Sequence, residues 1–245
     1  MTAPGRRAVG RAEPLAVREV GDPTAPAVVL VHGIGMSERY FRPLAAELAA
    51  DRRVLVPDLP GFGRSPRPAA APSVEDVART VLRMLGRREV GPAVLVGHSM
   101  GAQVVAAMMA RAPARAPAGV LIGPVVDSGA PSPAGQAWRL ARDGLHEPAR
   151  VNAAVTVDYL RTGPRWYAAM LPRMLGFDTC AAVSRVRGGI LVVRGERDRV
   201  CSRPWARRLA LAAPHGQLRE VRGAGHVAMA THPAVVARWI RERAA

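Results

Sequence analysis

The chain has 245 residues, of which 49% are hydrophobic and 22% are charged. This length and composition favour one globular domain with a sizeable core. The formal net charge of +16 raises the question of a nucleic-acid or anionic-membrane partner. However, all 35 basic residues are arginines scattered along the chain, and the aromatic residues that could stack on bases make up only 4% of it. We therefore expect no specific nucleic-acid partner.

Membrane and metal-binding patterns are also missing from the sequence. No uninterrupted apolar run approaches the roughly 18 residues of a membrane span, and no apolar segment follows Arg6 and Arg7 as a signal peptide would require. Cys180 and Cys201 have neither metal-ligand nor disulfide-framework spacing. We expect a cytoplasmic protein without a membrane span, metal ion or cofactor. Whether it is a monomer or a homodimer stays open.

Strand-like and helix-like segments alternate along the chain. Strands are predicted near 15–20, 27–31, 53–57, 93–97, 119–123, 189–194 and 217–222. Helices are predicted near 40–50, from Ser73 to Gly86, and near 100–111, 203–213 and 233–243. This alternation favours a mostly parallel sheet that is covered by helices on both faces.

The helix that opens at Ser73 has the clearest local signals. Ser73 can cap the first backbone N–H groups while the Asp76 side chain bonds back to Ser73. Apolar residues then recur at helical spacing: Val74, Val77, Ala78, Val81, Leu82 and Leu85. We interpret this stripe as part of the core and not as a site.

The turn after the predicted strand 93–97 carries the most informative motif, Gly97-His98-Ser99-Met100-Gly101. A G-x-S-x-G pattern between a strand and a helix is typical of a serine nucleophile on a strained, sharp turn. The two glycines fit this interpretation, because side chains two residues on either side of the serine would collide in such a turn.

Other strand ends carry further motifs. The strand 27–31 stops at His32-Gly33-Ile34-Gly35, and 53–57 leads into an Asp-x-Pro-Gly-x-Gly-x-Ser turn between Asp58 and Ser65. The last two strands lead into Gly195-Glu196-Arg197-Asp198 and Gly223-Ala224-Gly225-His226. In order and spacing these pieces resemble the α/β-hydrolase family, over about 15–239.

The resemblance implies an α/β-hydrolase fold, with a mostly parallel central sheet flanked by helices. It also implies a small helical cap inserted after the sixth strand, the strand 119–123. The core would then comprise 1–127 and 187–245, and the cap 128–186. Most apolar side chains of the cap should hold it to the core, and some should face a substrate. The candidates for substrate contact are Trp138, Tyr159, Trp166 and Met170.

A hydroxyl is a poor nucleophile at neutral pH, so Ser99 needs a base, and His226 in its Gly-Ala-Gly turn matches the family's histidine. Asp198 matches the family's usual acid, which orients the imidazole and stabilises its charged form. Glu196 and Asp127 compete for this role and stay open as alternatives. The backbone N–H groups of Met100 and Ile34 are the expected oxyanion donors. The turn from Asp58 to Ser65 is expected to brace neighbouring loops.

These residues predict acyl transfer from a small to medium carboxylic ester through an acyl-enzyme. A serine at position 99 argues against haloalkane dehalogenase and epoxide hydrolase chemistry, for which relatives of this fold use aspartate. Three alternatives remain open. The chain also resembles carbon-carbon bond hydrolases of vinylogous diketones and cofactor-free haloperoxidases or perhydrolases, and it could be a noncatalytic relative or a cyclase of a biosynthetic pathway.

Overall fold

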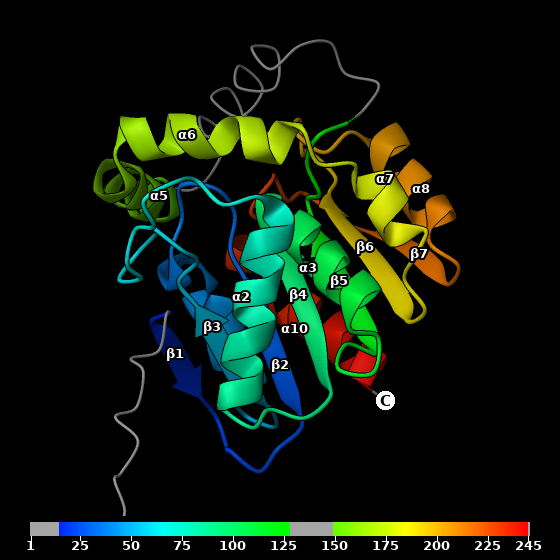
Figure 1. Ribbon diagram of the computed structural model, residues 1–245. Helices are drawn as coiled ribbons and strands as arrows, with labels where there is room; N and C mark the ends of the chain where they lie inside the picture. Colours follow the sequence, from blue (N-terminus) through cyan, green and yellow to red (C-terminus); the bar gives the residue numbers. More distant parts are fainter. Residues whose placement is uncertain (1–14, 128–148, 245) are drawn as a thin grey trace, which may run out of the picture.

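The computed structural model describes residues 15–127 and 149–244, which form a seven-stranded sheet with helices on both faces (Figure 1). The strands are β1 (Val17–Val20), β2 (Ala27–Val31), β3 (Arg53–Pro57), β4 (Ala93–His98), β5 (Ala118–Ile122), β6 (Gly189–Gly195) and β7 (Gly216–Val221). Their spatial order is β1-β3-β2-β4-β5-β6-β7. Only β1 pairs antiparallel, with β3, so the prediction of a mostly parallel sheet is confirmed.

Helices cover the sheet and the ends of its strands. They are η1 (Glu38–Phe41, a 3-10 helix), α1 (Arg42–Leu48), α2 (Val74–Arg87), α3 (Met100–Arg111), α5 (Ala149–Thr162), α6 (Pro164–Leu175), α7 (Thr179–Val183), α8 (Arg203–Ala212), α9 (Ala228–Thr231) and α10 (Pro233–Ala244). The helix predicted near 40–50 is therefore divided, and a proline stands at the beginning of its second part, where it suits a helix start.

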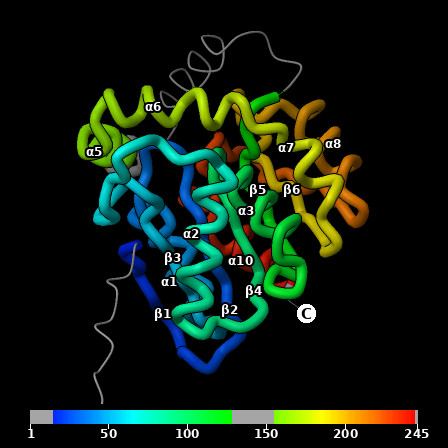
Figure 2. The backbone as a smooth tube through the Cα atoms, in the orientation of Figure 1, coloured from blue at the N-terminus to red at the C-terminus, as the bar shows by residue number. Residues whose placement is uncertain are grey.

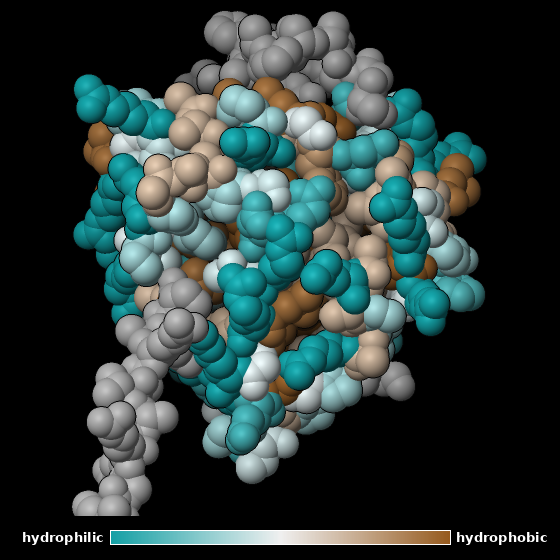
Figure 3. Space-filling view, in the orientation of Figure 1, coloured by the Kyte–Doolittle hydropathy of each residue, from teal (hydrophilic) through white to brown (hydrophobic). Residues whose placement is uncertain are grey.

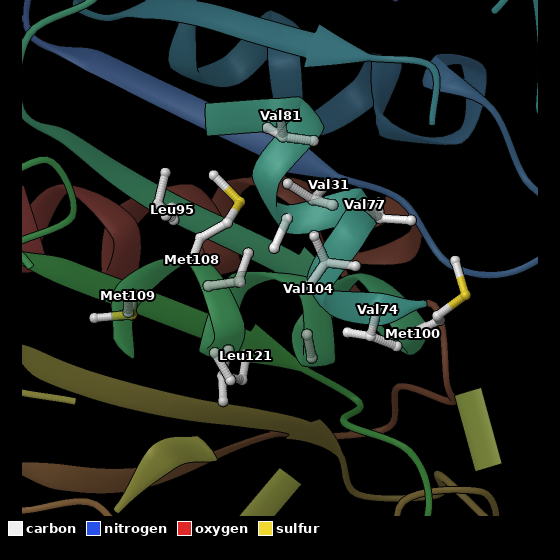
Figure 4. Packing of buried hydrophobic residues seen from close by; sticks show 14 of the residues in the cluster. Val31, Val74, Val77, Val81, Leu95, Met100, Val104, Met108, Met109 and Leu121 are labelled. Atoms are coloured by element: carbon white, nitrogen blue, oxygen red, sulfur yellow. The ribbon is translucent and has the colours of Figure 1, made fainter. Parts of the chain in front are cut away.

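Two apolar layers hold the helices to the sheet. Strand side chains alternate between the layers, so that Val29 and Val31 of β2 enter one while Val28 and Leu30 enter the other. The first layer includes α2 and α3, whose side chains interlock with Val31, Leu95 and Leu121 of the sheet (Figure 4). The second layer is formed with α1 and α10.

The expected capping of α2 is present. The Ser73 hydroxyl accepts from the N–H of Asp76 at 3.1 Å, and the Asp76 carboxylate accepts from the N–H of Ser73 at 3.3 Å. The buried stripe differs in one position, because Met84 is buried whereas Leu82 is only half-buried. Successive helical residues are rotated by about 100°, which turns Leu82 to the edge of the stripe that Val81 occupies.

The helical insertion follows β5, the fifth strand of the described chain, and not a sixth strand as expected. In the described residues β1 is the one strand before β2 and pairs directly with β3, which leaves four strands ahead of β5. Within the insertion, α6 lies across the end of the sheet at which the parallel strands finish (Figures 1 and 2). The cap boundaries themselves stay a prediction.

Hydrophilic side chains are spread over the face shown in Figure 3, with apolar ones between them. Several arginines are paired with carboxylates, as Arg53 and Arg88 are with Glu19. Among residues 15–127 and 149–244, no helix combines the length and the hydrophobicity that crossing a membrane requires.

The cap of α2 provides a stability test. We expect Ser73→Ala to lower the free energy of unfolding by about 1 kcal/mol, because it leaves the N–H of Asp76 without its acceptor. Ser73→Asp, which retains an acceptor, should lose much less. Urea unfolding followed by circular dichroism measures both, and equal midpoints for Ser73→Ala and the parent would contradict the prediction.

Candidate active site

Five loops meet at the edge of the sheet where the parallel strands finish. They follow β2, β4, β5, β6 and β7, and they carry His32, Ser99, Gly123, Asp198 and His226 respectively. The carboxyl ends of neighbouring parallel strands lie together by construction, which is why ligands bind at this edge in open α/β sheets.

Ser99 joins β4 to α3 in a strained conformation. Its backbone angles are φ 56° and ψ −121°, a region that residues other than glycine rarely occupy. A Cβ placed on Gly97 would lie 2.2 Å from the carbonyl oxygen of Gly101, and one on Gly101 would lie 2.1 Å from that of Val31. The predicted need for glycine at both positions is therefore confirmed. The turn is held from β5, since the N–H of Ser99 donates to the carbonyl of Ile122 at 3.0 Å.

His226 and Asp198 form a buried pair. Nδ1 of His226 lies 3.0 Å from Oδ2 of Asp198, whose other oxygen accepts from the N–H groups of Val200 and Cys201, both at 2.8 Å. Because a carboxylate only accepts, Nδ1 of the neutral imidazole carries the proton. In that tautomer Nε2 can accept a proton, which is the state a general base requires.

Gly123, at the end of β5, supports this pair. Its φ is +50°, and a Cβ at this position would lie 2.9 Å from Nδ1 of His226 and 3.2 Å from Oδ2 of Asp198. The absent side chain therefore leaves the space that the imidazole and carboxylate occupy. The sequence analysis did not single out Gly123, and its only signal was that it ends a predicted strand.

The competing acids have other contacts. Glu196 is exposed and accepts from the N–H of Gly223 at 2.8 Å. Asp127 accepts from the Ser202 hydroxyl at 3.1 Å and forms an ion pair with Arg208. Of the three candidate carboxylates, Asp198 has the contact of 3.0 Å with His226.

A buried arginine holds the loop that carries Asp198. The guanidinium of Arg194 donates to the carbonyl oxygens of Cys201 and Asp198, each at 3.0 Å, and of Glu196 at 3.3 Å. It is also paired with Glu220. The sequence analysis missed Arg194, although a charged residue at the end of an apolar strand was a usable signal.

Two further histidines connect the loops. Nδ1 of His32 donates to the carbonyl of Gly33, and its Nε2 accepts from the N–H of Leu59, both at 2.8 Å. His98 lies between the Tyr40 hydroxyl and the carbonyl of His226, and its ring packs 4.6 Å from the ring of His226. Burial lowers the pKa of both His32 and His98, and the neighbouring His226 lowers the pKa of His98 further.

The two expected oxyanion donors belong to loops that abut each other. A Cβ placed on Gly33 would lie 3.0 Å from Cβ of Ser99, so the loop after β2 lies against the serine. The N–H of Gly33 donates to the Tyr40 hydroxyl at 2.8 Å. The N–H of Ile34, the next residue, takes no part in this bond. Met100 begins α3, where backbone N–H groups point out of the helix.

The turn after β3 braces its neighbours, as expected. The buried carboxylate of Asp58 accepts from the N–H of Glu38 at 2.8 Å and from that of Arg64 at 3.0 Å. The Ser65 hydroxyl donates to the carbonyl of Asp58 at 2.6 Å. These bonds join the turn to the start of η1.

The four candidates for substrate contact are distributed as follows. Trp138 lies outside the described residues. Tyr159 of α5 packs on Gly35, where a Cβ would lie 2.6 Å from its ring. Trp166 and Met170 of α6 are buried in the apolar layer that includes α2 and α3, and Trp166 packs on Gly61. A substrate role for these residues stays a prediction.

Comparison with known proteins shows that the protein is a hydrolase, the class that the fold and the arrangement of these residues also indicate. The model of the alpha/beta hydrolase family matches residues 28–239, so the chain belongs to that family.

Solved structures share its fold over most of their length. An esterase from Thermogutta terrifontis is 24% identical with a TM-score of 0.80, over 93% of this chain and 92% of its own. The 2-hydroxy-6-oxo-6-phenylhexa-2,4-dienoate hydrolase of Rhodococcus sp. strain RHA1 is 24% identical, also with a TM-score of 0.80, over 94% of both chains.

Several curated relatives match over shorter stretches. The magnesium-chelatase 30 kDa subunit of Rhodobacter capsulatus is 31% identical over 120 residues, which are 49% of this chain. The chain spans less than half of the length of the first curated relatives that it matches, 42% and 26% respectively.

The space beside Gly123 can be tested. We expect Gly123→Ala to reduce hydrolytic activity about a hundredfold, because the new methyl group displaces the imidazole of His226 and misplacement by about 1 Å has an effect of this size. Gly163→Ala is the matched control, since Gly163 also has a positive φ, +74°, but has no atom within 4 Å of an added Cβ. Equal activities of the two variants would contradict the prediction.

The buried histidines predict a pH-dependent stability. Because burial lowers the pKa of His32 and His98 below 6.5, the unfolded chain binds more protons than the folded chain just below that pH. Acidification from about pH 7 to about pH 5 should therefore lower the free energy of unfolding, by up to about 1.4 kcal/mol per pH unit for each histidine. Urea unfolding over this range measures it, and His98→Gln should flatten the dependence. A free energy that does not change with pH would count against it.

Proposed function

We propose that this hydrolase cleaves small to medium carboxylic esters with Ser99 as nucleophile, His226 as general base and Asp198 as the acid that orients it. The backbone N–H groups of Ile34 and Met100 form the oxyanion hole. The proposal includes a small-molecule substrate and a cytoplasmic location, and its chemistry requires no cofactor or metal ion.

The contact between His226 and Asp198 carries the proposal. A buried carboxylate 3.0 Å from Nδ1 fixes the tautomer in which Nε2 is a base, and it stabilises the imidazolium that forms when a proton is taken up. The same imidazole packs on His98, the residue directly before Ser99. A base that packs on the residue before a serine with a strained backbone supports nucleophilic catalysis by that serine.

The reaction then follows in two halves. His226 removes the proton of the Ser99 hydroxyl as Oγ attacks the ester carbonyl, and the N–H groups of Ile34 and Met100 stabilise the oxyanion. His226 returns the proton to the leaving alkoxide, which departs as the alcohol. His226 then removes a proton from water as the water attacks the acyl-enzyme. The tetrahedral intermediate breaks down, His226 returns the proton to Oγ of Ser99, and the carboxylic acid is released.

The proposal is tested with a series of p-nitrophenyl esters of increasing acyl length. We expect the parent to hydrolyse short to medium members and Ser99→Ala to lose at least about a thousandfold in kcat. Asp198→Asn should lose up to about ten-thousandfold, because the amide favours the wrong tautomer of His226. Asp127→Asn is the matched control and should retain the parent's activity.

Two results would overturn the proposal. Hydrolysis that persists in Ser99→Ala would exclude the serine nucleophile. A folded parent that hydrolyses no ester but cleaves a vinylogous diketone, with carbon-carbon cleavage products, would shift the function to the second candidate. That candidate is retained because the Rhodococcus hydrolase with the same fold acts on a dienoate.

A further inference from the structure

Tyr40 and His98 form a buried chain of hydrogen bonds that joins three of the loops at the site. The hydroxyl of Tyr40 lies 2.8 Å from the N–H of Gly33 and 2.8 Å from Nδ1 of His98. Nε2 of His98 lies 3.0 Å from the carbonyl oxygen of His226. Tyr40 and His98 are each only 3% exposed. We call the four groups, from the Gly33 amide to the His226 carbonyl, the Tyr40–His98 relay.

We propose that Tyr40 and His98 are positioning residues, which fix the oxyanion loop and the loop of the general base relative to Ser99. This inference rests on the proposed function and adds to it two residues that act through their hydrogen bonds to the backbone of neighbouring loops.

The direction of each bond in the relay follows from its chemistry. The carbonyl of His226 can only accept, so Nε2 of His98 carries the proton and donates it. Nδ1 of the neutral ring is then an acceptor, and the Tyr40 hydroxyl donates to it. The same hydroxyl oxygen accepts from the N–H of Gly33, which can only donate. Every donor in the relay thus meets an acceptor.

The relay keeps these protonation states through the range in which a histidine base works. Three titratable groups face His98. They are Tyr40 of η1, His226 of the loop after β7 and His32 of the loop after β2. Burial and the two histidines hold the pKa of His98 well below 6.5, so it stays neutral. Burial raises the pKa of Tyr40 well above 10, so its hydroxyl keeps its proton.

The relay acts on both partners of Ser99. The bond to the N–H of Gly33 fixes the His32–Gly33 peptide, which directly precedes the peptide that carries the N–H of Ile34, the proposed oxyanion donor. The bond to the His226 carbonyl fixes the backbone from which the imidazole extends to Asp198. His98 directly precedes Ser99 in the chain. The loop after β2 and the loop that carries His226 are therefore both positioned relative to the proposed nucleophile.

Three variants separate the two halves of the relay. Tyr40→Phe removes the hydroxyl. His98→Gln keeps a donor at the position of Nε2 but loses the acceptor at Nδ1, whereas His98→Asn keeps an acceptor near Nδ1 and loses the donor to His226. The controls are His215→Gln and His215→Asn, because His215 is exposed.

We expect Tyr40→Phe and His98→Gln to lower kcat for p-nitrophenyl esters about tenfold to a hundredfold, with KM nearly unchanged and the acidic limb of the pH profile unmoved. The double variant should be no worse than Tyr40→Phe, since His98→Gln breaks a bond that Tyr40→Phe already removes. His98→Asn should lower kcat and also move the acidic limb of kcat/KM, because it releases the backbone of His226. The control variants should match the parent.

A merely structural role gives a different pattern, in which the variants lose thermal stability while the folded fraction keeps the parent's kcat and pH profile. That pattern would overturn the proposal, as would a kcat of Tyr40→Phe within about twofold of the parent.

A measurement on the parent protein covers variants that fail to fold and separates the two proposals. Nitrogen-15 spectra of the imidazoles should show His98 neutral, with its proton on Nε2, at every pH down to about 5. A proton on Nδ1, or ordinary titration near pH 6.5, would overturn the relay even if the esterase activity is found. If no ester is hydrolysed and the spectrum is as expected, the proposed function fails while the relay stands as a structural feature.

Discussion

The sharp turn from β4 into α3 is the constraint on which the site depends. A residue held at φ 56° and ψ −121° stores strain of about 1 to 3 kcal/mol, and such a conformation persists only where the surroundings leave no alternative. Here Gly101 packs on the carbonyl of Val31, Ser99 is bonded to Ile122, and His98 is held on both ring nitrogens. The turn therefore ties β2, β4 and β5 together at their carboxyl ends.

Burial of polar groups at this edge restricts the conformations that the surrounding loops can adopt. A buried donor or acceptor without a partner is unfavourable by about 1 to 3 kcal/mol, so each loop is stable only in the arrangement that pairs its groups. Arg194 satisfies three carbonyl oxygens of the loop that carries Asp198. Asp58 does the same for two amides from different segments. Loops fixed in this way can hold catalytic groups without help from a substrate.

The sequence predicts what depends on local pattern and misses what depends on topology. Apolar runs place the strands, and the glycines around Ser99 predict a turn whose geometry the structure confirms. Tyr40 and His98 are 58 residues apart, and no local signal connects them. They meet because β2 and β4 are adjacent in the sheet, so that η1, which follows β2, lies beside the end of β4.

The loop after β2 is held from two sides, and this links the helical insertion to the proposed chemistry. On the side of η1, the Tyr40 hydroxyl accepts from the N–H of Gly33. Above it, α5 contributes the ring of Tyr159 against Gly35 and the Thr162 hydroxyl, which donates to the Gly35 carbonyl at 3.2 Å. The buried Asp158 accepts from the Ser37 hydroxyl at 2.6 Å just beyond the loop. α5 therefore packs on the loop that carries Ile34, so substitutions in α5 also change the support of this loop.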